Sequence, residues 1–432
     1  MKHTQNITKD KLWTKHFVII LIISFFASVI MNMQGSTLPM YVQHIGGSKS
    51  SVGIVTGIFT LSALLFRPWF GNLLDNSSRR IVLIIGIIIL SLVSLSYNLA
   101  YTVGILLFLR FLHGIGLSAQ TTAVGTIISD IVPHTRLGEG VGYNGIAVTA
   151  ATAIGPALGL YLIQYYNYNT FFGVTFVFGV LALIGALFIN YERKKINNLY
   201  VCGRNIGGKN KKYSGVIKDK AINSSEDYLK KRKKGSILEA TAVPASIVMF
   251  FIMLTTASIF TFLPVYATSR NISNIGIFFT IYALAFLVTR TITDKLSARY
   301  SITRIMLPGM ILLILSFVIL AFATTLPGFL IAGVLYGAGY SSTQPTLSSL
   351  AVSQCSPDRR GAANATFFSS MDIGFCIGAV IWGVLSQKIG LSSIYLGSAV
   401  CGILSLSIYV FMLNNKLMKN NSDSNYQAVE NL

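Results

Sequence analysis

Long apolar stretches alternate with short polar breaks along nearly the whole chain. A helix needs about 20 apolar residues to cross the roughly 30 Å of hydrocarbon in a bilayer. Twelve stretches reach that length, with cores near residues 16–40, 50–72, 79–101, 103–130, 138–163, 168–190, 241–267, 272–293, 302–322, 326–352, 361–387 and 391–414. The pattern predicts an all-α membrane protein with twelve transmembrane helices.

The first stretch follows several lysines, as the apolar core of a signal peptide does. It extends from about His16 to Val42, whereas such a core has about 7–15 residues. We therefore expect a retained first helix.

One hydrophilic segment, rich in Lys, Asn, Gly and Ser, divides the twelve stretches into two sets of six. We expect a first half over residues 1–190, a cytoplasmic linker over 191–240, a second half over 241–414 and a cytoplasmic tail over 415–432. The basic run Lys230–Lys234 in the linker is interpreted as a topology anchor, with contact to anionic lipid as the alternative.

The composition agrees with a chain that faces lipid. Hydrophobic residues make up 53% of it and charged residues 11%, whereas soluble proteins have about 25% charged residues. The net charge is +20, but 14 of the 34 Lys and Arg lie between Arg193 and Lys234, and most others lie at the ends of apolar stretches. This placement indicates membrane topology and not a nucleic-acid groove.

The positive charges also predict an orientation. With a cytoplasmic N-terminus, the outer loops contain only Lys49, Arg270 and Lys388. Cytoplasmic loops of membrane proteins carry the excess of Lys and Arg. We therefore expect both termini in the cytoplasm and location in the cell membrane.

The two halves share short sequences at a nearly constant offset. Leu38-Pro39-Met40-Tyr41 matches Leu263-Pro264-Val265-Tyr266, and the other matches are Gly114 with Gly337, Gly116 with Gly339, Pro133 with Pro357, Arg136 with Arg360 and Gly155 with Gly378. All offsets lie between 223 and 225. Parallel six-helix repeats with a substrate site between them are one plan of secondary transporters.

Three motifs give a family resemblance. Gly71 to Arg80 reads GNLLDNSSRR, similar to the major facilitator signature G-x-L-x-D-x-x-G-R-R, with Ser78 in place of its second glycine. The fourth stretch contains RFLHGIG from Arg110 to Gly116, similar to a motif of proton-coupled members. Together these motifs resemble the major facilitator superfamily, specifically its twelve-helix proton-coupled drug and metabolite exporters.

The third motif lies in the fifth stretch. Gly142, Gly155, Pro156 and Gly159 match most of the antiporter motif G-x8-G-x3-G-P-x2-G-G, although Ala151 and Leu160 replace two of its glycines. Proline and glycine in a helix predict a bend and close packing. The resemblance implies that this segment closes the two halves against leak; a generic kink is the alternative.

The first motif also suggests a conformational switch. Gly71 would allow a close helix approach, and Asp75 would meet the N-terminus of the eleventh helix near Gly361. Arg79 is expected to pair with Asp130, with Arg80 and Arg136 nearby. Simple topology charges are the alternative.

Asp372 is the one acidic residue well inside an apolar stretch, about 16 Å from the helix start. Charges at membrane depth are costly and mark functional sites, so Asp372 is a candidate for a proton or for a cationic substrate group. Its alternative is a structural carboxylate satisfied by hydroxyls or by a buried arginine. Arg110 is the second candidate, as a fixed charge that tunes a partner or holds an anion. The resemblance implies that it contributes to proton coupling, and a helix-packing arginine bonded to carbonyls is the alternative. Arg67 and Arg290 are expected to be structural.

Polar residues on other helices are candidates for lining the cavity, with helix–helix hydrogen bonding as the alternative for each. They are Asn32, Gln34, Gln120, Asn144, Tyr266, Tyr340 and Gln344.

The function predicted is proton-coupled efflux of small organic molecules, with opine-type metallophores as a narrower substrate class. A proton-coupled importer of a sugar or another nutrient is the alternative. The sequence shows no nucleophile–base set, phosphate loop or metal-ligand cluster, so neither an enzyme, a cofactor, a metal nor a disulfide is expected. The expected partners are a small-molecule substrate, protons and the bilayer, with no nucleic acid, and the chain is expected to be a monomer.

Overall fold

The computed structural model describes residues 11–76, 78–190, 239–297, 299–353, 355–356 and 359–414. The predicted linker, apart from its last two residues, and the predicted tail lie outside this part. All regular elements in the described part are helices. In the first half they are α1 (Lys15–His44), α2 (Lys49–Asn76), α3 (Arg79–Ser96), α4 (Val103–Ile131), α5 (Leu137–Tyr165) and α6 (Tyr168–Leu187).

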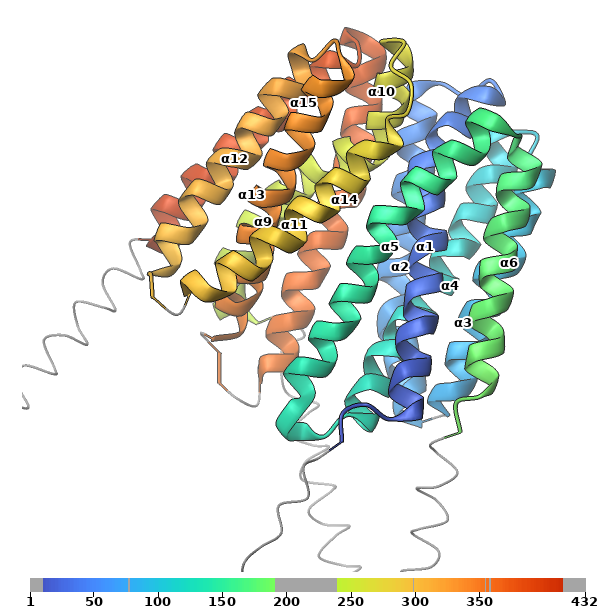
Figure 1. The fold of residues 1–432 in the computed structure, drawn as a ribbon, viewed down its shortest axis with the longest axis vertical. Coiled ribbons are helices and arrows are strands. Elements are labelled where there is room, and N and C mark those ends of the chain that lie inside the picture. Colours follow the sequence, from blue (N-terminus) through green and yellow to red (C-terminus); the bar gives the residue numbers. More distant parts are fainter. Residues whose placement is uncertain are drawn as a thin grey trace, which may run out of the picture.

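The second half begins with a composite helix, in which α9 (Val243–Ala257) continues through a π-helical turn (Ser258–Phe262) into α10 (Leu263–Ser269). The other helices are α11 (Gly276–Ser297), α12 (Ile302–Phe322), α13 (Leu326–Ser353), α14 (Arg360–Ile389) and α15 (Ser392–Ile408). Counting the composite helix once, each half has six helices, as the sequence predicts. Figure 1 shows the two halves beside each other.

Eleven helices of the described part are long and apolar enough to cross a membrane. The remaining long helix, α13, has a similar length of 28 residues but is less apolar, because it contains many Gly, Ser, Thr and Tyr residues. Large apolar side chains such as Leu65, Phe108 and Phe322 are exposed on the outside of the bundle. Such a surface is suited to lipid.

Side-chain caps begin several of these helices. The hydroxyl of Thr14 accepts the backbone N–H of Phe17, and Asn167 accepts that of Thr170 through its side-chain oxygen. Both bonds satisfy backbone donors that the first helical turn leaves free.

The repeat seen in the sequence is reproduced in the packing. A Cβ on Gly114 would lie 2.3 Å from the carbonyl oxygen of Phe59 in α2, and a Cβ on Gly337 would lie 2.4 Å from that of Tyr282 in α11. Both glycines therefore allow the fourth helix of their half to touch the second. Gly116 and Gly339 face the third helices, α3 and α12, in the same paired way.

The two matched tyrosines also make equivalent contacts. The Tyr41 hydroxyl donates to the carbonyls of Tyr97 and Ala100, and the Tyr266 hydroxyl donates to those of Leu320 and Ala321. Each ties the first helix of its half to the end of the third. The halves are therefore two copies of one packing scheme.

The halves meet tightly at one end of the bundle. A Cβ on Gly53 of α2 would lie 2.2 Å from the Ala379 carbonyl oxygen of α14, and the hydroxyl of Ser50 donates to Gln387 at 2.5 Å. On the other side, the Thr280 hydroxyl of α11 donates to the Ala153 carbonyl of α5 at 2.9 Å.

Toward the opposite ends of the same helices the halves separate, and α12 and α13 slant away from α1 there (Figure 1). A Cβ on Gly71 of α2, on Gly142 of α5 or on Gly361 of α14 would meet no atom within 4 Å. The close helix approach expected at Gly71 is therefore absent from this conformation.

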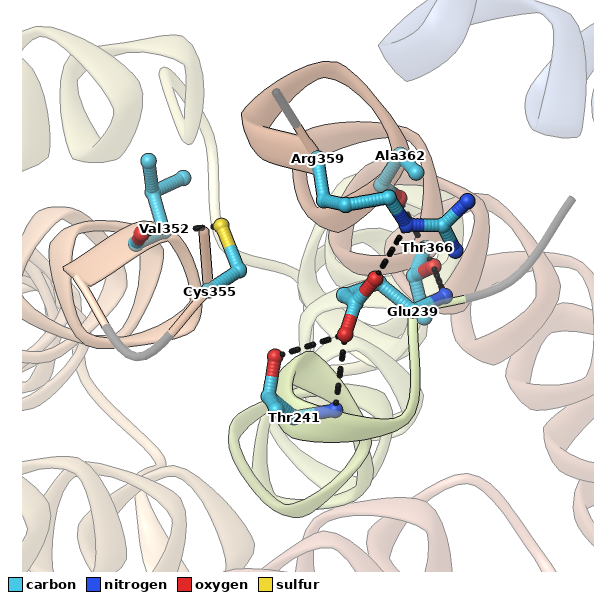
Figure 2. A network of polar contacts seen from close by, with 7 residues as sticks. All are labelled: Glu239, Thr241, Val352, Cys355, Arg359, Ala362 and Thr366. Atoms are coloured by element: carbon cyan, nitrogen blue, oxygen red, sulfur yellow. Dashed lines mark hydrogen bonds and ion pairs between the residues drawn. The ribbon is translucent and has the colours of Figure 1, made fainter. Parts of the chain in front are cut away.

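Glu239 anchors the start of the second half (Figure 2). Its carboxylate accepts from Arg359 at 2.7 Å and from the Thr241 hydroxyl at 3.0 Å, and its backbone N–H donates to Thr366 at 2.9 Å. The hydrogen bond from Arg359 is the main cause that lowers the pKa of Glu239. The network joins the start of α9 with the N-terminal end of α14.

Candidate functional site

A cavity of about 380 Å³ lies between the two halves. The first half contributes residues from α1, α2, α4 and α5, and the second half contributes residues from the composite helix, α11, α13 and α14. The lining residues are Met31, Asn32, Gly35, Thr56, Phe59, Arg110, Val148, Thr149, Thr152, Met253, Thr256, Phe260, Thr261, Tyr282, Phe286, Tyr340 and Phe375. Its volume is in the range of small-molecule sites.

Arg110 supplies the charge of this cavity. Its side chain is 2% exposed, and its guanidinium lies over the ring of Phe59, 4.3 Å from the ring centre. The Tyr97 hydroxyl also interacts with the guanidinium. Nε and Nη1 have no hydrogen-bond partner. A buried cation with free donors is costly, and such groups are uncommon in native structures.

His113 lies one helical turn after Arg110 and is fully buried. Its Nδ1 is 2.7 Å from the Tyr97 hydroxyl, its ring packs edge-on against Phe59, and its Nε2 has no partner. Tyr97 thereby contacts both Arg110 and His113. This cluster holds Arg110 at the cavity wall.

The second half forms an aromatic wall opposite Arg110. Phe260, Tyr282, Phe286, Tyr340 and Phe375 line it, and the rings of Phe286 and Tyr340 are 6.2 Å apart. The π-helical turn Ser258–Phe262 places Phe260 and Thr261 at the cavity. The Thr261 hydroxyl is buried without a hydrogen-bond partner.

Asp372 does not line this cavity but pairs with Arg67 across the halves. The Arg67 Nη1 donates to the Asp372 Oδ2 at 2.5 Å, and the two side chains are 35% and 24% exposed. The pair joins α2 of the first half to α14 of the second. Arg67, which the sequence suggested to be structural, is thus the partner of the predicted proton site.

The predicted switch residues form local pairs. Arg79 Nε lies 3.4 Å from Asp130 Oδ2, which confirms the expected pairing. Arg136 pairs with Glu139 at 2.6 Å, and Arg80 donates to Asn190 and to the Leu187 carbonyl. The side chain of Asp75 lies outside the described part, so its expected contact near Gly361 remains a prediction.

The antiporter-like motif packs inside the first half. Cβ atoms on Gly155 and Gly159 would lie 2.8 Å from Asn32 and from the Thr37 hydroxyl of α1. Pro156 is buried inside α5 between them. Contact with the other half comes instead from their neighbours, since Gly276 of α11 packs on Ala157. The two glycines thus allow close α1–α5 packing, while Gly142 faces open space.

Two of the seven predicted cavity residues, Asn32 and Tyr340, line the cavity. Tyr266 lies elsewhere, because its hydroxyl bonds to the end of α12. Gln34 is buried and donates to the Ser94 hydroxyl at 2.7 Å, as expected of a helix–helix contact. Gln120, Asn144 and Gln344 are also absent from the lining.

Sequence reasoning missed His113, the cavity threonines and the role of Arg67. His113 lies within the quoted fourth-helix motif, so its position beside Arg110 was the available signal. Arg67 and Asp372 are separated by 305 positions, and no local pattern links them.

Two six-helix repeats with a cavity between them are an architecture found in transporters. The chain matches the family model of the Major Facilitator Superfamily over residues 20–274 and 245–428, and it belongs to this superfamily. It is therefore a multi-pass membrane transporter.

Several curated proteins are similar over almost their whole length. An uncharacterized MFS-type transporter of Methanocaldococcus jannaschii is 27% identical over 91% of this chain and 94% of that protein. The staphylopine export protein of Staphylococcus aureus is 23% identical over 92% and 94%. A multi-drug resistance efflux pump PmrA homolog of Lactococcus lactis is 23% identical over 96% and 99%.

Solved structures share the fold. A POT family transporter in complex with a thioalcohol conjugated peptide matches with a TM-score of 0.69 and 15% identity, over 91% of this chain and 95% of that one. The nucleoside transporter NupG matches with a TM-score of 0.65 and 13% identity, over 92% and 99%.

Proposed function

We propose that the protein is a proton-driven antiporter that exports small organic molecules by alternating access. The Arg67–Asp372 ion pair carries this proposal, because it is a titratable contact between the two halves. Ionisable residues within transmembrane helices commonly form proton relays.

Protonation would act on the contact between α2 and α14. The pair requires a deprotonated Asp372, so the conformation described corresponds to the proton-released form. Proton uptake removes the charge of Asp372 and leaves Arg67 without its counter-ion. The relative free energies of the two conformations of the halves then change, which couples the proton to the substrate cavity.

The positive charges support an orientation in which the separated ends of the helices face the cytoplasm. Arg79, Arg136, Arg299 and Arg360 all lie at those ends of their helices. The conformation is then inward-facing, in the cell membrane, with both termini cytoplasmic. The protein acts as a monomer, since the cavity is formed by the two halves of one chain.

The similar proteins named for efflux and export support outward transport. Transporters named for other substrates share the fold, so proton-coupled import is the rival function. Both use the same architecture, and only a transport measurement distinguishes them.

The test is proton-gradient dissipation in everted membrane vesicles, with a panel of cationic, neutral and anionic compounds. Dissipation with the wild type but not with Asp372→Asn supports antiport through Asp372. Asp294→Asn is the matched control, because Asp294 pairs with Arg290 on its own helix. Substrate uptake coupled to proton entry in right-side-out vesicles would instead establish import.

The switch role of Asp75 stays within this proposal. Asp75→Asn is expected to slow the transport cycle more than it weakens substrate binding. An unchanged maximal transport rate would contradict that role.

A further inference from the structure

We infer that the cavity selects organic anions, and that Arg110 recognises a carboxylate on an otherwise aromatic or apolar substrate. The inference rests on the proposed function for the existence of a transported substrate. It goes further in naming the substrate's chemical class and the residue that selects it.

Arg110 has unsatisfied hydrogen-bond donors. Two of its three guanidinium nitrogens, Nε and Nη1, have no partner, although the side chain is only 2% exposed. A buried guanidinium with free donors favours a carboxylate, because the carboxylate accepts charge-assisted hydrogen bonds from it.

The cavity carries a positive charge that none of its described lining residues balances. No Asp, Glu, Lys or His is among the described residues that line it, so Arg110 gives it a net positive charge. The carboxylate at membrane depth, Asp372, does not balance Arg110, because it pairs with Arg67 outside the lining. In a low-dielectric site an unbalanced cation repels cationic ligands and attracts anions.

The wall formed by the second half suits an apolar body with a polar end. The aromatic rings of the second half can hold a flat apolar body, while the buried Thr261 hydroxyl is a second polar group without a partner. Thr261 and Arg110 come from opposite halves, so a ligand that bonds to both would bridge them. A few polar groups in an apolar pocket are what fixes ligand orientation in such sites.

The experiment compares three fluorescent probes with one dansyl body and different ends: dansylglycine (carboxylate), dansylglycinamide (neutral) and dansylcadaverine (ammonium). Binding to purified protein in lipid nanodiscs is measured by fluorescence titration without a proton gradient. We expect wild type to prefer dansylglycine over the amide by about tenfold or more, since a hydrogen bond to a charged group contributes that much.

Arg110→Gln should abolish this preference, so that the carboxylate and the amide bind equally. Arg290→Gln, which removes an arginine outside the cavity lining, should keep it. Thr261→Val, which removes the hydroxyl and leaves the side-chain volume almost unchanged, should weaken the binding of dansylglycine severalfold. As a measurement that needs no variant, dansylglycine should raise the melting temperature of wild type more than dansylglycinamide does.

Equal or tighter binding of the amide or the ammonium probe to wild type would overturn the inference. So would a carboxylate preference that survives in Arg110→Gln, or the absence of saturable dansylglycine binding. Because no gradient is applied, these outcomes are independent of proton coupling. Failure of antiport in vesicles would not contradict the carboxylate preference. Loss of the carboxylate preference would not contradict antiport.

Discussion

The two halves share one scaffold but differ in their buried charges. Arg67 of α2 and Arg290 of α11 occupy equivalent positions at an offset of 223. Arg67 pairs with Asp372 in the other half, whereas Arg290 pairs with Asp294 one turn along its own helix, at 3.2 Å. One charge therefore joins the halves, and its counterpart does not.

The central cavity repeats this asymmetry. At the same offset, position 110 corresponds to Gly333, where a Cβ would lie 3.1 Å from the ring of Phe278. The first half thus places a cation at a position where the second half packs an aromatic ring. The packing contacts that the two halves share maintain the fold. The residues that differ between equivalent positions, such as Arg110 and Gly333, give the halves different charges.

The largest effect is expected from neutralising the partners of the two equivalent arginines. Asp372→Asn should reduce proton-coupled transport to the level of membranes without the protein, because it removes the titratable contact between the halves. Asp294→Asn should retain most transport, since Asp294 is 59% exposed in a pair within one helix. Everted-vesicle assays measure both, and equal losses would remove the functional distinction between the two pairs.

The shared scaffold predicts equal effects for matched glycines. Gly114→Val and Gly337→Val should each destabilise the protein by about 1–3 kcal/mol or more, because each new side chain meets a backbone carbonyl of a neighbouring helix. Melting temperatures of the purified variants test this. Gly142→Ala, at an open position of α5, is the control and should change little. A loss of stability in only one of the two valine variants would show that the matched glycines are not energetically equivalent.

The matched tyrosines predict a smaller symmetric effect. Tyr41→Phe and Tyr266→Phe each remove a hydroxyl that bonds to two buried carbonyls, which should cost about 1 kcal/mol. Thermal unfolding would detect both. If transport were lost in Tyr266→Phe at unchanged stability, Tyr266 would have a direct role despite its distance from the cavity lining.

The smallest effect concerns the start of each half. The first half begins with the uncharged cap Thr14, and the second begins with Glu239, whose side chain is 13% exposed. Because the folded-state pKa of Glu239 is lowered from 4.5, its stabilising contribution is present above about pH 4.5 and is lost as pH falls through the lower folded value. Unfolding of wild type and Glu239→Gln should therefore differ at neutral pH and converge in acid. A constant difference would exclude this linkage.

The sequence by itself determined the architecture. The helix boundaries, the division into two halves, the repeat and the Arg79–Asp130 pair follow from apolar run length, a nearly constant offset and a local motif. These features depend on neighbours along the chain or on the physics of a bilayer, in which a helix satisfies the polar groups of its own backbone.

The site was decided by the tertiary structure. Asp372 was identifiable as a buried carboxylate, but its pairing with Arg67 depends on the contact of α2 with α14. That contact left Arg110 as the charge of the cavity. The open space beside Gly71 and the internal packing of Gly155 and Gly159 depend in the same way on how the halves are positioned. A helix specifies which residues share a face, whereas the partner of that face is determined only when distant helices pack together.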